Sequence, residues 1–478
     1  MRANAVVVPV NPMNRADEFA HYISDPNTKV VICSADLAGF VATANAAVPA
    51  ADRLRHVLVT RYTDAMPEGA IDPTDQAPAA MDTWLRADPG LPDDLHTPYS
   101  RWPDVLAARH VPGPHTAQAD DLVMLPYTSG TTGLPKGCIH THRTLMANAC
   151  GGQWSNAGAE TISLGVVPMF HITGMLYGVL GAVFQGATTV ILPRWDRELA
   201  GRLLSRYRIS HWTCIPTMVI DLFASPNYKT FELGSLRNIS GGGAAMPQAV
   251  AERLQAEFGI TFAEGYGLTE TAAPSHANPP ERAKLQCLGM PIFGVDSRVV
   301  DPLTLEEMPV GEVGEIVTHG PMVFKGYWRH PEATAAAFVE LPGADDAKGK
   351  AFFRTGDLGR MDDEGYFFMT DRLKRMINAS GYKVWPAEVE ALLYKHPAVQ
   401  EACIIASRDA YRGETVKAVV VLRAEAKANT TAEDITAWSR EHMAAYKVPK
   451  LVEFVDALPK SGSGKVMWRL LQDQEAAA

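Results

Sequence analysis

The sequence predicts an α/β protein. A large N-terminal domain of α/β subdomains with a small β-rich subdomain is expected, followed by a small α+β C-terminal domain. Strand-like runs alternate with helical stretches through the first two thirds of the 478 residues, which is typical of a fold with much parallel sheet. The length suggests about three domains or subdomains at roughly 150 residues each. A hydrophobic content of 47% and a charged content of 21% are those of an ordinary globular chain.

The individual elements follow from the hydrophobic pattern along the chain. Short apolar runs predict strands, and apolar residues at helical spacing predict amphipathic helices. Residues 61–119 are rich in Pro, Asp and Ala and predict surface loops with short helices, whereas 294–326 predicts the β-rich subdomain. Buried strands are expected at 6–9, 29–33, 55–60, 188–192 and 260–262, and amphipathic helices at 198–207 and 249–258.

One stretch, 161–193, contains no Asp, Glu, Lys or Arg over 33 residues. Its length would permit a membrane helix. However, Pro168, His171, Gln185 and five glycines interrupt it. A buried strand (GVVPMF), a buried helix near 175–184 and a second buried strand (ATTVIL) are therefore expected, and no membrane span.

A domain boundary is predicted near Asp371, which divides the chain into 1–370 and 371–478. The preceding run FFRTGDLGRMDDEGYFFMTDR is typical of a hairpin with a turn at EG. The segment that follows has a compact α+β pattern. Its predicted elements are helices at 385–394 and 432–443, strands at 399–406 and 416–422, and a helix at the end of the chain.

Charge and cysteine content exclude several classes of protein. The formal net charge of −10 argues against a general nucleic-acid binder, which would carry a basic excess. The six cysteines form no C-x-x-C pair and are too few for a disulfide framework. The first residues lack the long apolar core of a signal peptide. A cytoplasmic protein with reduced cysteines is expected, and His140 and His142 are interpreted as loop or strand residues rather than a metal site.

The most informative loop is YTSGTTGLPKG, Tyr127 to Gly137. It is not a Walker A loop, because Lys136 follows Pro135 and precedes Gly137, where that motif needs G-K-[ST]. Its threonine and serine hydroxyls, its glycines and its one lysine still suit a phosphate chain. Composition alone leaves two readings open, a phosphate-binding loop and a solvated turn.

Six further motifs accompany this loop. Individually each has a simple structural explanation, such as a turn or a loop before a helix. Together, in this order and spacing, they identify the chain as similar to the adenylate-forming superfamily, which includes acyl-CoA synthetases, firefly luciferase and the adenylation domains of peptide synthetases. The resemblance covers essentially the whole chain. The motifs are PMFHITGM (168–175), ISGGGAAMP (239–247), EGYGLTET (264–271), FRTGDL (353–358), DRLKRMINASGYKVWPAEVE (371–390) and PKSGSGK (459–465).

The resemblance implies an acid–thiol ligase that uses ATP, Mg²⁺ and coenzyme A as co-substrate. A carboxylate attacks the α-phosphate of ATP and gives acyl-AMP and pyrophosphate; a thiol then displaces AMP and forms a thioester. A carboxylate is a poor acyl donor, and its mixed anhydride with AMP has a good leaving group. Because two anions must meet, such an enzyme needs positive charge and accurate positioning.

The resemblance also implies which residues hold the nucleotide. Thr269 is expected to bond the α-phosphate, Glu270 to bind Mg²⁺ and Asp357 to accept hydrogen bonds from the ribose hydroxyls. Gly243, Ala244 and Tyr266 are expected to flank adenine, with Gly267 also at the nucleotide. Arg372 is expected to touch ribose or phosphate. The loop over the β- and γ-phosphates would comprise Thr128, Ser129, Gly130, Thr131, Thr132, Gly133 and Lys136.

Catalysis would depend on Lys465, which bridges the carboxylate and the α-phosphate in the first half-reaction. By resemblance the small domain that carries it rotates between the half-reactions about a hinge at Lys374. His171 would shield the acyl site until adenylation is complete. The implied catalytic set is Lys465, Thr269, Glu270 and His171, and the implied CoA-binding residues are Ser380, Gly381 and Tyr382. Asn378 stands where some relatives carry a lysine for the second half-reaction, so that role is not assigned.

The acyl pocket expected by resemblance is mostly apolar and has no charge that would pair with an amino group. A medium- or long-chain fatty acid is therefore the first choice of substrate, and an aryl acid is the alternative. The expected acceptor is CoA, with a carrier protein as the other possibility. The expected pocket residues are His171, Gly174, Met175, Tyr177, Gly178, Trp212, Cys214 and Ala244.

The start of the chain departs from the family pattern. RANAVVVPVNP resembles a segment that several dozen residues precede in relatives, so an early helix and strands of the large domain are expected to be missing. A non-catalytic nucleotide-binding remnant is therefore kept as a third hypothesis. A homodimer is left open.

Overall fold

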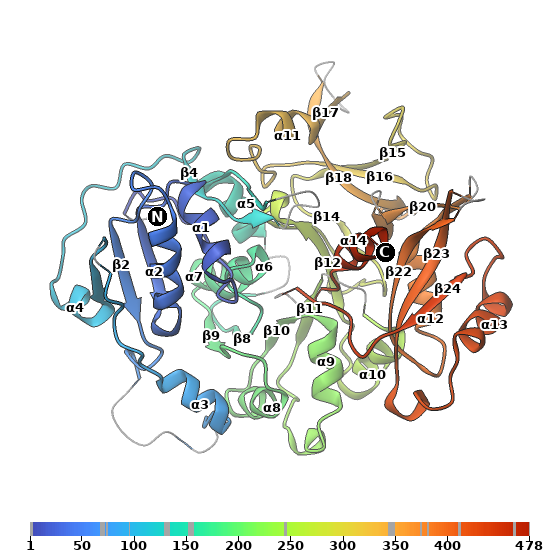
Figure 1. Ribbon diagram of the computed structural model, residues 1–478, viewed down its shortest axis with the longest axis horizontal. Coiled ribbons are helices and arrows are strands. Elements are labelled where there is room, and N and C mark those ends of the chain that lie inside the picture. Colours follow the sequence, from blue (N-terminus) through green and yellow to red (C-terminus); the bar gives the residue numbers. More distant parts are fainter. Residues whose placement is uncertain are drawn as a thin grey trace. The chain divides into compact units, whose positions relative to one another are not determined.

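The computed structural model describes residues 3–66, 72, 75–94, 96–128, 134–151, 157–242, 246–342, 349–372, 375–379, 382–409, 413–461 and 465–477 (Figure 1). The chain forms two compact units. The first comprises Met1–Ser275, Pro279–Leu285 and Pro321–Ala336, and the second comprises His276–Asn278, Gln286–Gly320 and Ala337–Ala478. The β-rich subdomain thus groups with the C-terminal segment, whereas the boundary predicted at Asp371 places it in the large domain.

The first unit begins with a small parallel sheet. Its strands β1 (Val30–Ser34), β2 (His56–Thr60) and β3 (Tyr99–Arg101) pair in that order, so strands form as predicted at 29–33 and 55–60. The first of them is not buried as expected, since Val30 is 52% exposed and Ile32 is 62% exposed. Helices α1 (Ala16–Ser24) and α2 (Ala38–Ala47) bury Phe19, Ile23 and Val41 against Val57 and Val59 of β2. The short helices α3 (Ala79–Arg86) and α4 (Trp102–Ala107) follow.

The strand predicted at 6–9 is wrong. Only Val7 makes a bridge, to Met124 of β4 (Leu122–Met124), and both Val6 and Val7 are exposed. The apolar run VVV at 6–8 therefore predicts a buried strand, but the segment is largely exposed.

A second sheet forms the centre of the first unit. Its order is β14-β13-β12-β11-β10-β8-β9, and the strands from β12 to β9 are parallel. Strand β14 (Met290–Pro291) pairs with His276 and Ala277 at the end of β13, which like β14 belong to the second unit. The bounds of the other strands are β8 Ile162–Gly165, β9 Thr188–Ile191, β10 His211–Cys214, β11 Asn238–Gly241, β12 Ala263–Leu268 and β13 Ala273–Ala277. A strand forms as predicted at 188–192, but it is not buried as expected, since Ile191 is 61% exposed. The strand predicted at 260–262 begins later in the chain. The glycine-rich segment AEGYGL forms β12, and Ile260 and Phe262 are buried but precede this strand.

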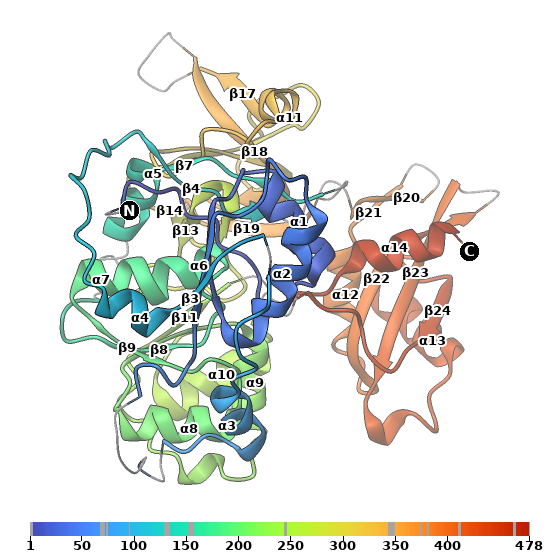
Figure 2. The same cartoon turned by 60° about the vertical axis from the view of Figure 1, so that its left-hand side comes forward.

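Helices α8 (Arg197–Arg206), α9 (Pro216–Phe223) and α10 (Gln248–Phe258) accompany these strands, as Figure 2 shows. Two of these helices match the predictions at 198–207 and 249–258. The side chains of Leu164, Trp212 and Ile239 are in register on neighbouring strands and share one core cluster with residues of the three helices. The core of the unit therefore lies between this face of the sheet and the helices.

The uncharged stretch contains a strand, a helical segment and a strand, but the predicted positions and burial hold only in part. The first strand, β8, shares only its last residue, Gly165, with the predicted run GVVPMF. The helical segment and the second strand are not fully buried, since Val183 is 80% exposed and Ile191 is 61% exposed. Between β8 and β9 lie α6 (Ile172–Met175), a π-helical turn at Leu176–Leu180 and α7 (Gly181–Gln185). The turn is closed by the Gly181 N–H, which donates to the Leu176 carbonyl five residues earlier. Of the helices in the described ranges, none combines the length and the apolar content that crossing a membrane requires.

The second unit contains two mainly antiparallel sheets. The first has the order β15-β16-β18-β17, with β19 also paired to β18; its strands are β15 Asp296–Val300, β16 Gly314–His319, β17 Phe338–Leu341, β18 Lys350–Met361 and β19 Phe367–Arg372. The second sheet has the order β21-β20-β23-β22, with β24 paired to β23; its strands are β20 Ile377–Ala379, β21 Tyr382–Val384, β22 Val399–Asp409, β23 Gly413–Leu422 and β24 Leu451–Phe454.

Three helices cover the second of these sheets. They are α12 (Pro386–Leu393), α13 (Ala432–His442) and α14 (Trp468–Ala477). These helices and the strands β22 and β23 confirm the elements predicted after residue 384. Ile404 of β22 shares a buried core cluster with Val389 of α12 and Ile435 of α13, so this core lies between the sheet and two of the helices.

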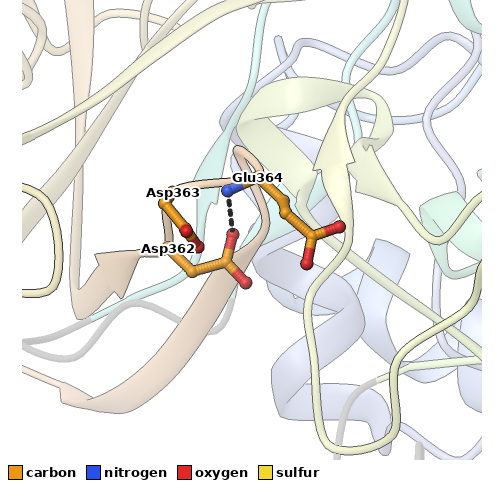
Figure 3. A group of neighbouring side chains, drawn as sticks. All are labelled: Asp362, Asp363 and Glu364. Carbon is orange, nitrogen blue, oxygen red and sulfur yellow. Dashed lines mark hydrogen bonds between the residues drawn. The ribbon is translucent and has the colours of Figure 1, made fainter.

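The predicted hairpin at DDEG is the turn between β18 and β19 (Figure 3). Carboxylate oxygens of Asp362, Asp363 and Glu364 lie within 4.8 Å of one another. The Asp362 carboxylate accepts hydrogen bonds from the backbone N–H groups of Glu364 (3.1 Å) and Tyr366 (2.9 Å), and Gly365 has a φ of +83°. The acidic cluster is therefore explained by the requirements of a tight turn.

Close backbone approach determines the ends of the central strands. A Cβ atom at Gly241, the last residue of β11, would lie 1.9 Å from the Cys214 carbonyl oxygen of β10. A Cβ at Gly267 of β12 would lie 1.8 Å from the Ala273 carbonyl oxygen. Only glycine permits these close approaches of β11 to β10 and of β12 to β13.

Gly241→Ala should lower the free energy of unfolding by about 2 kcal/mol or more, because the added methyl group forces two strands apart. Urea unfolding followed by circular dichroism measures the change. Gly39→Ala is the matched control, since no atom lies within 4 Å of a Cβ at this exposed position in α2. It should be neutral or stabilise the protein by up to about 1 kcal/mol. Equal effects of the two substitutions would refute the packing argument.

His140 on β7 (His140–Thr141) is fully buried and hydrogen-bonded on both nitrogens. Its Nε2 donates to the Thr269 carbonyl oxygen at 2.7 Å, and its Nδ1 lies 3.1 Å from the Thr144 hydroxyl. Burial lowers the pKa of His140 to about 4. The imidazole is therefore neutral at physiological pH and serves as a fixed donor.

The stability of the protein should fall as the pH drops from 6.5 towards 4. The unfolded His140 gains a proton in this range while the folded residue stays neutral, so His140 alone should cost about 2 kcal/mol between pH 7.5 and 5. Urea unfolding at the two pH values tests this. His140→Gln keeps a neutral donor and should reduce the difference, whereas the partly buried His142→Gln is the control. An unchanged difference in His140→Gln would contradict the assignment.

Candidate active site

The two ends of the loop 127–137 are held together by a short hairpin. Strand β5 (Tyr127–Thr128) pairs with β6 (Lys136–Gly137), so that Thr128 is opposite Lys136. Two of the predicted phosphate-loop residues, Thr128 and Lys136, are thereby neighbours. The other five, Ser129, Gly130, Thr131, Thr132 and Gly133, lie outside the described residues.

Helix α1 supports the base of this hairpin through Tyr127. The Tyr127 hydroxyl donates to the Asp25 carboxylate at 2.5 Å, and its ring lies under Gly137, where a Cβ would come within 3.1 Å. His21 Nε2 lies 2.9 Å from the Pro135 carbonyl oxygen, to which it donates. Burial and the Asp25 carboxylate raise the pKa of Tyr127 well above its usual value, so the phenol remains a donor.

A backbone ladder connects the hairpin to the segment 325–328. Ile139 N–H donates to the Gly326 carbonyl (2.9 Å), Lys325 N–H to the Ile139 carbonyl (2.9 Å) and Trp328 N–H to the Gly137 carbonyl (2.8 Å). The Trp328 indole also donates to the Asp25 carbonyl oxygen at 3.2 Å. Segments far apart in the chain thus form one support for the predicted phosphate loop.

The ladder places Tyr327 between two charged groups. Its hydroxyl donates to the Glu270 carboxylate, with 2.8 Å between Tyr327 Oη and Glu270 Oε1. The Lys136 ammonium lies 5.0 Å from the centroid of the Tyr327 ring. Of the predicted ATP-binding residues, Lys136 and Glu270 are therefore brought together by a residue that sequence reasoning missed.

Thr269 and Glu270 lie on a single turn after β12, and buried polar side chains fix its backbone. Besides the bond from His140 to the Thr269 carbonyl, Asn148 Nδ2 donates to the carbonyls of Thr271 (2.9 Å) and Ala272 (2.7 Å). Asn148 is on α5 (His142–Gly151) and is 2% exposed. No local pattern marks Asn148 or Tyr327, because their partners lie far away in the sequence.

The predicted adenine site is described in part. Tyr266 on β12 is buried, and the Gly267 backbone next to it passes against Ala273. Gly243 and Ala244 lie outside the described residues. Gly242, which follows β11, approaches the Gly265 carbonyl so closely that a Cβ would lie 2.4 Å from its oxygen.

The predicted acyl-pocket residues occupy two places. His171 caps α6, where its Nδ1 accepts the Thr173 N–H at 3.3 Å, and a Cβ at Gly174 would lie 2.2 Å from the Pro168 carbonyl oxygen. Met175 ends α6, and Gly178, on the π turn with Tyr177, is close to the methyl group of Met169. Burial raises the pKa of Tyr177 to about 12.

The other acyl-pocket residues lie on β10. Trp212 and Cys214 are each 1% exposed and belong to the core cluster that includes residues of α8 and α9. Trp195 stacks on Trp212 with 5.9 Å between the ring centroids. Ala244, the last of the set, lies outside the described residues.

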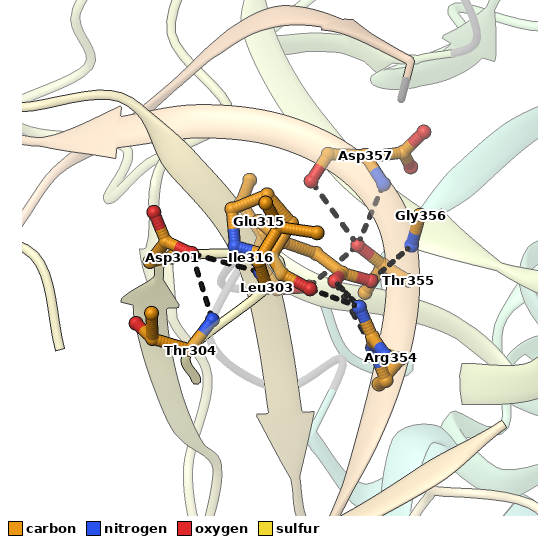
Figure 4. Close-up of polar contacts among 10 residues, drawn as sticks. Asp301, Leu303, Thr304, Glu315, Ile316, Arg354, Thr355, Gly356 and Asp357 are labelled. Carbon is orange, nitrogen blue, oxygen red and sulfur yellow. Dashed lines mark hydrogen bonds and ion pairs between the residues drawn. The ribbon is translucent and has the colours of Figure 1, made fainter. Parts of the chain in front are cut away.

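Asp357 belongs to the second unit, on β18, and is 1% exposed (Figure 4). Thr355 Oγ1 accepts the Asp357 N–H at 3.0 Å and donates to the Ile316 carbonyl at 2.6 Å. Glu315, also buried, pairs with Arg354 and accepts the Gly356 N–H at 3.1 Å. A rigid strand segment therefore carries the predicted ribose-binding carboxylate.

The remaining predicted residues lie on the C-terminal segment. The backbone of Arg372 on β19 pairs with that of Asp357 on β18. The side chains of Arg372 and of Tyr382 on β21 are not among those that the structure describes. Lys374, Ser380 and Gly381 are wholly outside it.

Lys465 closes a short hairpin. Ser461 N–H donates to the Lys465 carbonyl at 2.8 Å, Lys460 and Val466 form a bridge, and the Lys465 side chain is exposed. An exposed lysine on a long arm suits a contact that forms in only one stage of a reaction.

Comparison with known proteins identifies the family. A model described as AMP-binding enzyme matches residues 1–328, and a model described as AMP-binding enzyme C-terminal domain matches residues 388–465. The chain is 33% identical to the long-chain-fatty-acid–CoA ligase of Bacillus subtilis, over 99% of this chain and 82% of that protein. It is 34% identical to a feruloyl-CoA synthase of an Amycolatopsis species, over 98% of this chain and 83% of that protein.

A solved structure agrees with these matches. The ATP-bound structure of MatB from Rhodopseudomonas palustris is similar with a TM-score of 0.80 and 28% sequence identity, over 99% of this chain and 84% of that one. The predicted fold class is confirmed. The chain belongs to the AMP-binding enzyme family, the adenylate-forming superfamily that its motifs predict, and within it to the acyl-CoA synthetase type.

Proposed function

We propose that this protein is an ATP-dependent acid–CoA ligase that forms acyl-AMP and then acyl-CoA. The observation that carries the proposal is the arrangement around Tyr327, where the Lys136 ammonium and the Glu270 carboxylate lie next to the base of the loop 127–137. A cation and a metal-binding carboxylate beside a glycine- and hydroxyl-rich loop suit a triphosphate. Relatives named as CoA ligases and an ATP-bound structural neighbour support the same activity.

The residues present fit magnesium. The carboxylate of Glu270 is a hard oxygen ligand, and its Oε1 is oriented by the Tyr327 hydroxyl. When bound through Glu270 and phosphate oxygens, magnesium would neutralise phosphate charge. Cys138 does not compete as a soft ligand, because burial raises the pKa of its thiol well above the usual value, and the nearby Glu270 charge acts in the same direction.

In the proposed first half-reaction, the chain's own residues bind and orient the reactants. Thr128 and Lys136 hold the β- and γ-phosphates, and Thr269 donates to the α-phosphate. Asp357 accepts hydrogen bonds from the ribose hydroxyls. Lys465 stabilises the negative charge as the substrate carboxylate attacks the α-phosphate and pyrophosphate leaves.

In the proposed second half-reaction, the CoA thiol loses its proton, forms the thioester bond and displaces AMP. Ser380, Gly381 and Tyr382 are proposed to bind CoA, and Lys374 to act as the hinge between the two stages. His171, at the start of α6, is proposed to close the acyl site until the adenylate has formed.

We propose a medium- or long-chain fatty acid as the first choice of substrate, in line with the apolar residues predicted around the acyl group. An aryl acid is the second candidate. Similarity to a feruloyl-CoA synthase favours it, and the hydroxyl of the partly buried Tyr177, one of the predicted pocket residues, offers a polar group to such an acid. A carrier protein in place of CoA would give the same first half-reaction.

The proposal predicts pyrophosphate release that requires ATP, magnesium and an acid. A panel of graded fatty acids and of benzoates and cinnamates should contain at least one acid that gives release, with thioester appearing only when CoA is added. Coupled pyrophosphate detection and chromatography of the products measure both steps. A folded protein that binds ATP but releases no pyrophosphate with any acid would instead be the nucleotide-binding remnant.

Lys465→Ala should lower acyl-AMP formation by about 100-fold or more, because a positive charge that acts mainly in the transition state is lost. Thioester formation from supplied acyl-AMP should remain within a few-fold of wild type. Lys460→Ala is the control, since this lysine in the same hairpin pairs with Glu401 at 2.8 Å. If Lys465→Ala slows both half-reactions equally, the division of labour proposed for Lys465 is wrong.

A further inference from the structure

We propose that Tyr327 is a positioning residue for the two charged groups of the phosphate site. Its hydroxyl would orient the carboxylate of Glu270 towards a divalent cation, and its ring would hold the ammonium of Lys136 at the base of the loop. This inference rests on the proposed function, because it assigns Tyr327 a task in binding magnesium and ATP.

The hydrogen bond to Glu270 has the direction and length that such a task requires. Tyr327 Oη donates to Glu270 Oε1 at 2.8 Å, and both residues belong to the first unit. A phenol hydroxyl can donate and an ionised carboxylate can only accept, so the direction of this bond is fixed. A bond to one oxygen restricts rotation of the carboxylate and leaves its other lone pairs directed at fixed positions.

The Tyr327 ring contributes a second contact. The Lys136 Nζ lies 5.0 Å from the ring centroid, within the range of a cation–π interaction. Lysine has a long flexible side chain, so a fixed aromatic face reduces the conformational freedom that ATP binding would otherwise have to remove. One residue thereby sets the position of both the cation and the carboxylate.

Tyr327 is itself held firmly. Its backbone N–H donates to the Thr334 hydroxyl at 2.9 Å, it bridges to Cys138, and its ring meets that of Phe324 edge-on with 4.8 Å between centroids. The neighbouring Gly326 has a φ of +132°. Phe324 N–H in turn donates to the Glu270 carbonyl at 2.8 Å. A side chain supported in this way can fix its partners to a fraction of an ångström.

Tyr327→Phe tests the hydroxyl, because it removes one oxygen and keeps the ring. The readout is thermal stabilisation by ATP as magnesium is titrated, which needs no turnover. The magnesium concentration for half-maximal stabilisation should rise about 10-fold or more. Stabilisation by ATP in the presence of EDTA should not change. A half-maximal magnesium concentration equal to that of wild type would overturn the role of the hydroxyl.

Tyr228→Phe is the matched control. The Tyr228 hydroxyl also donates to a glutamate, Glu257 Oε2 at 2.5 Å, but it lies in the core cluster beside α10. This variant should lower the unfolding temperature and leave the magnesium titration within about two-fold of wild type, as expected for a bond that only stabilises the fold. A shift equal to that of Tyr327→Phe would overturn the proposal.

Tyr327→Leu tests the ring. It should also weaken stabilisation by ATP in EDTA, because Lys136 loses its aromatic contact. If Tyr327→Leu and Tyr327→Phe give the same result in EDTA, the ring has no such role. A wild-type protein that ATP and magnesium do not stabilise at all would overturn the proposed function as well, whereas a wild-type response unchanged in Tyr327→Phe overturns this inference alone.

Discussion

A short backbone ladder is the constraint on which the phosphate site depends. The hydrogen bonds between 137–139 and 325–328 connect segments that the sequence separates widely, and they bring Lys136, Glu270 and Tyr327 into contact range. Backbone bonds suit this purpose because their geometry does not depend on a flexible side chain. The close approach of strands at Gly241 and Gly267 provides the base from which the Thr269–Glu270 turn extends.

Around these groups the structure keeps most ionisable side chains neutral. His140 is a neutral donor, Cys138 remains a thiol, and Tyr127 and Tyr327 remain phenols, in each case with burial as the largest cause of the pKa shift. In a partly desolvated region every additional charge would carry a high cost. Lys136 and Glu270 are then the charged partners proposed for the triphosphate and its cation.

The sequence predicted the α/β class and most elements, because apolar periodicity reports burial on one face of a helix or strand. The prediction failed where apolar character and burial do not coincide, as at Val6 and Val7, which are apolar but exposed. It also missed β12, because this strand consists largely of glycine and polar residues that no strand pattern marks. The predicted residues Lys136 and Glu270 could be found because they lie in compact motifs. Tyr327, His140 and Asn148 could not, since each acts on a partner in a distant part of the sequence.

The π turn at Leu176–Leu180 has a consequence for how the acyl site could diverge. The turn holds one residue more than a regular α-helical turn, and the Gly181 N–H bonds five residues back to Leu176. Removal of a single residue there would restore a regular helix and rotate α6 relative to α7 by about 100°, the angle per helical residue. Tyr177 and Gly178 would then face new neighbours while the sheet beneath stayed intact. A one-residue deletion could thus change the shape of the site in a single step, where substitutions would change it only gradually.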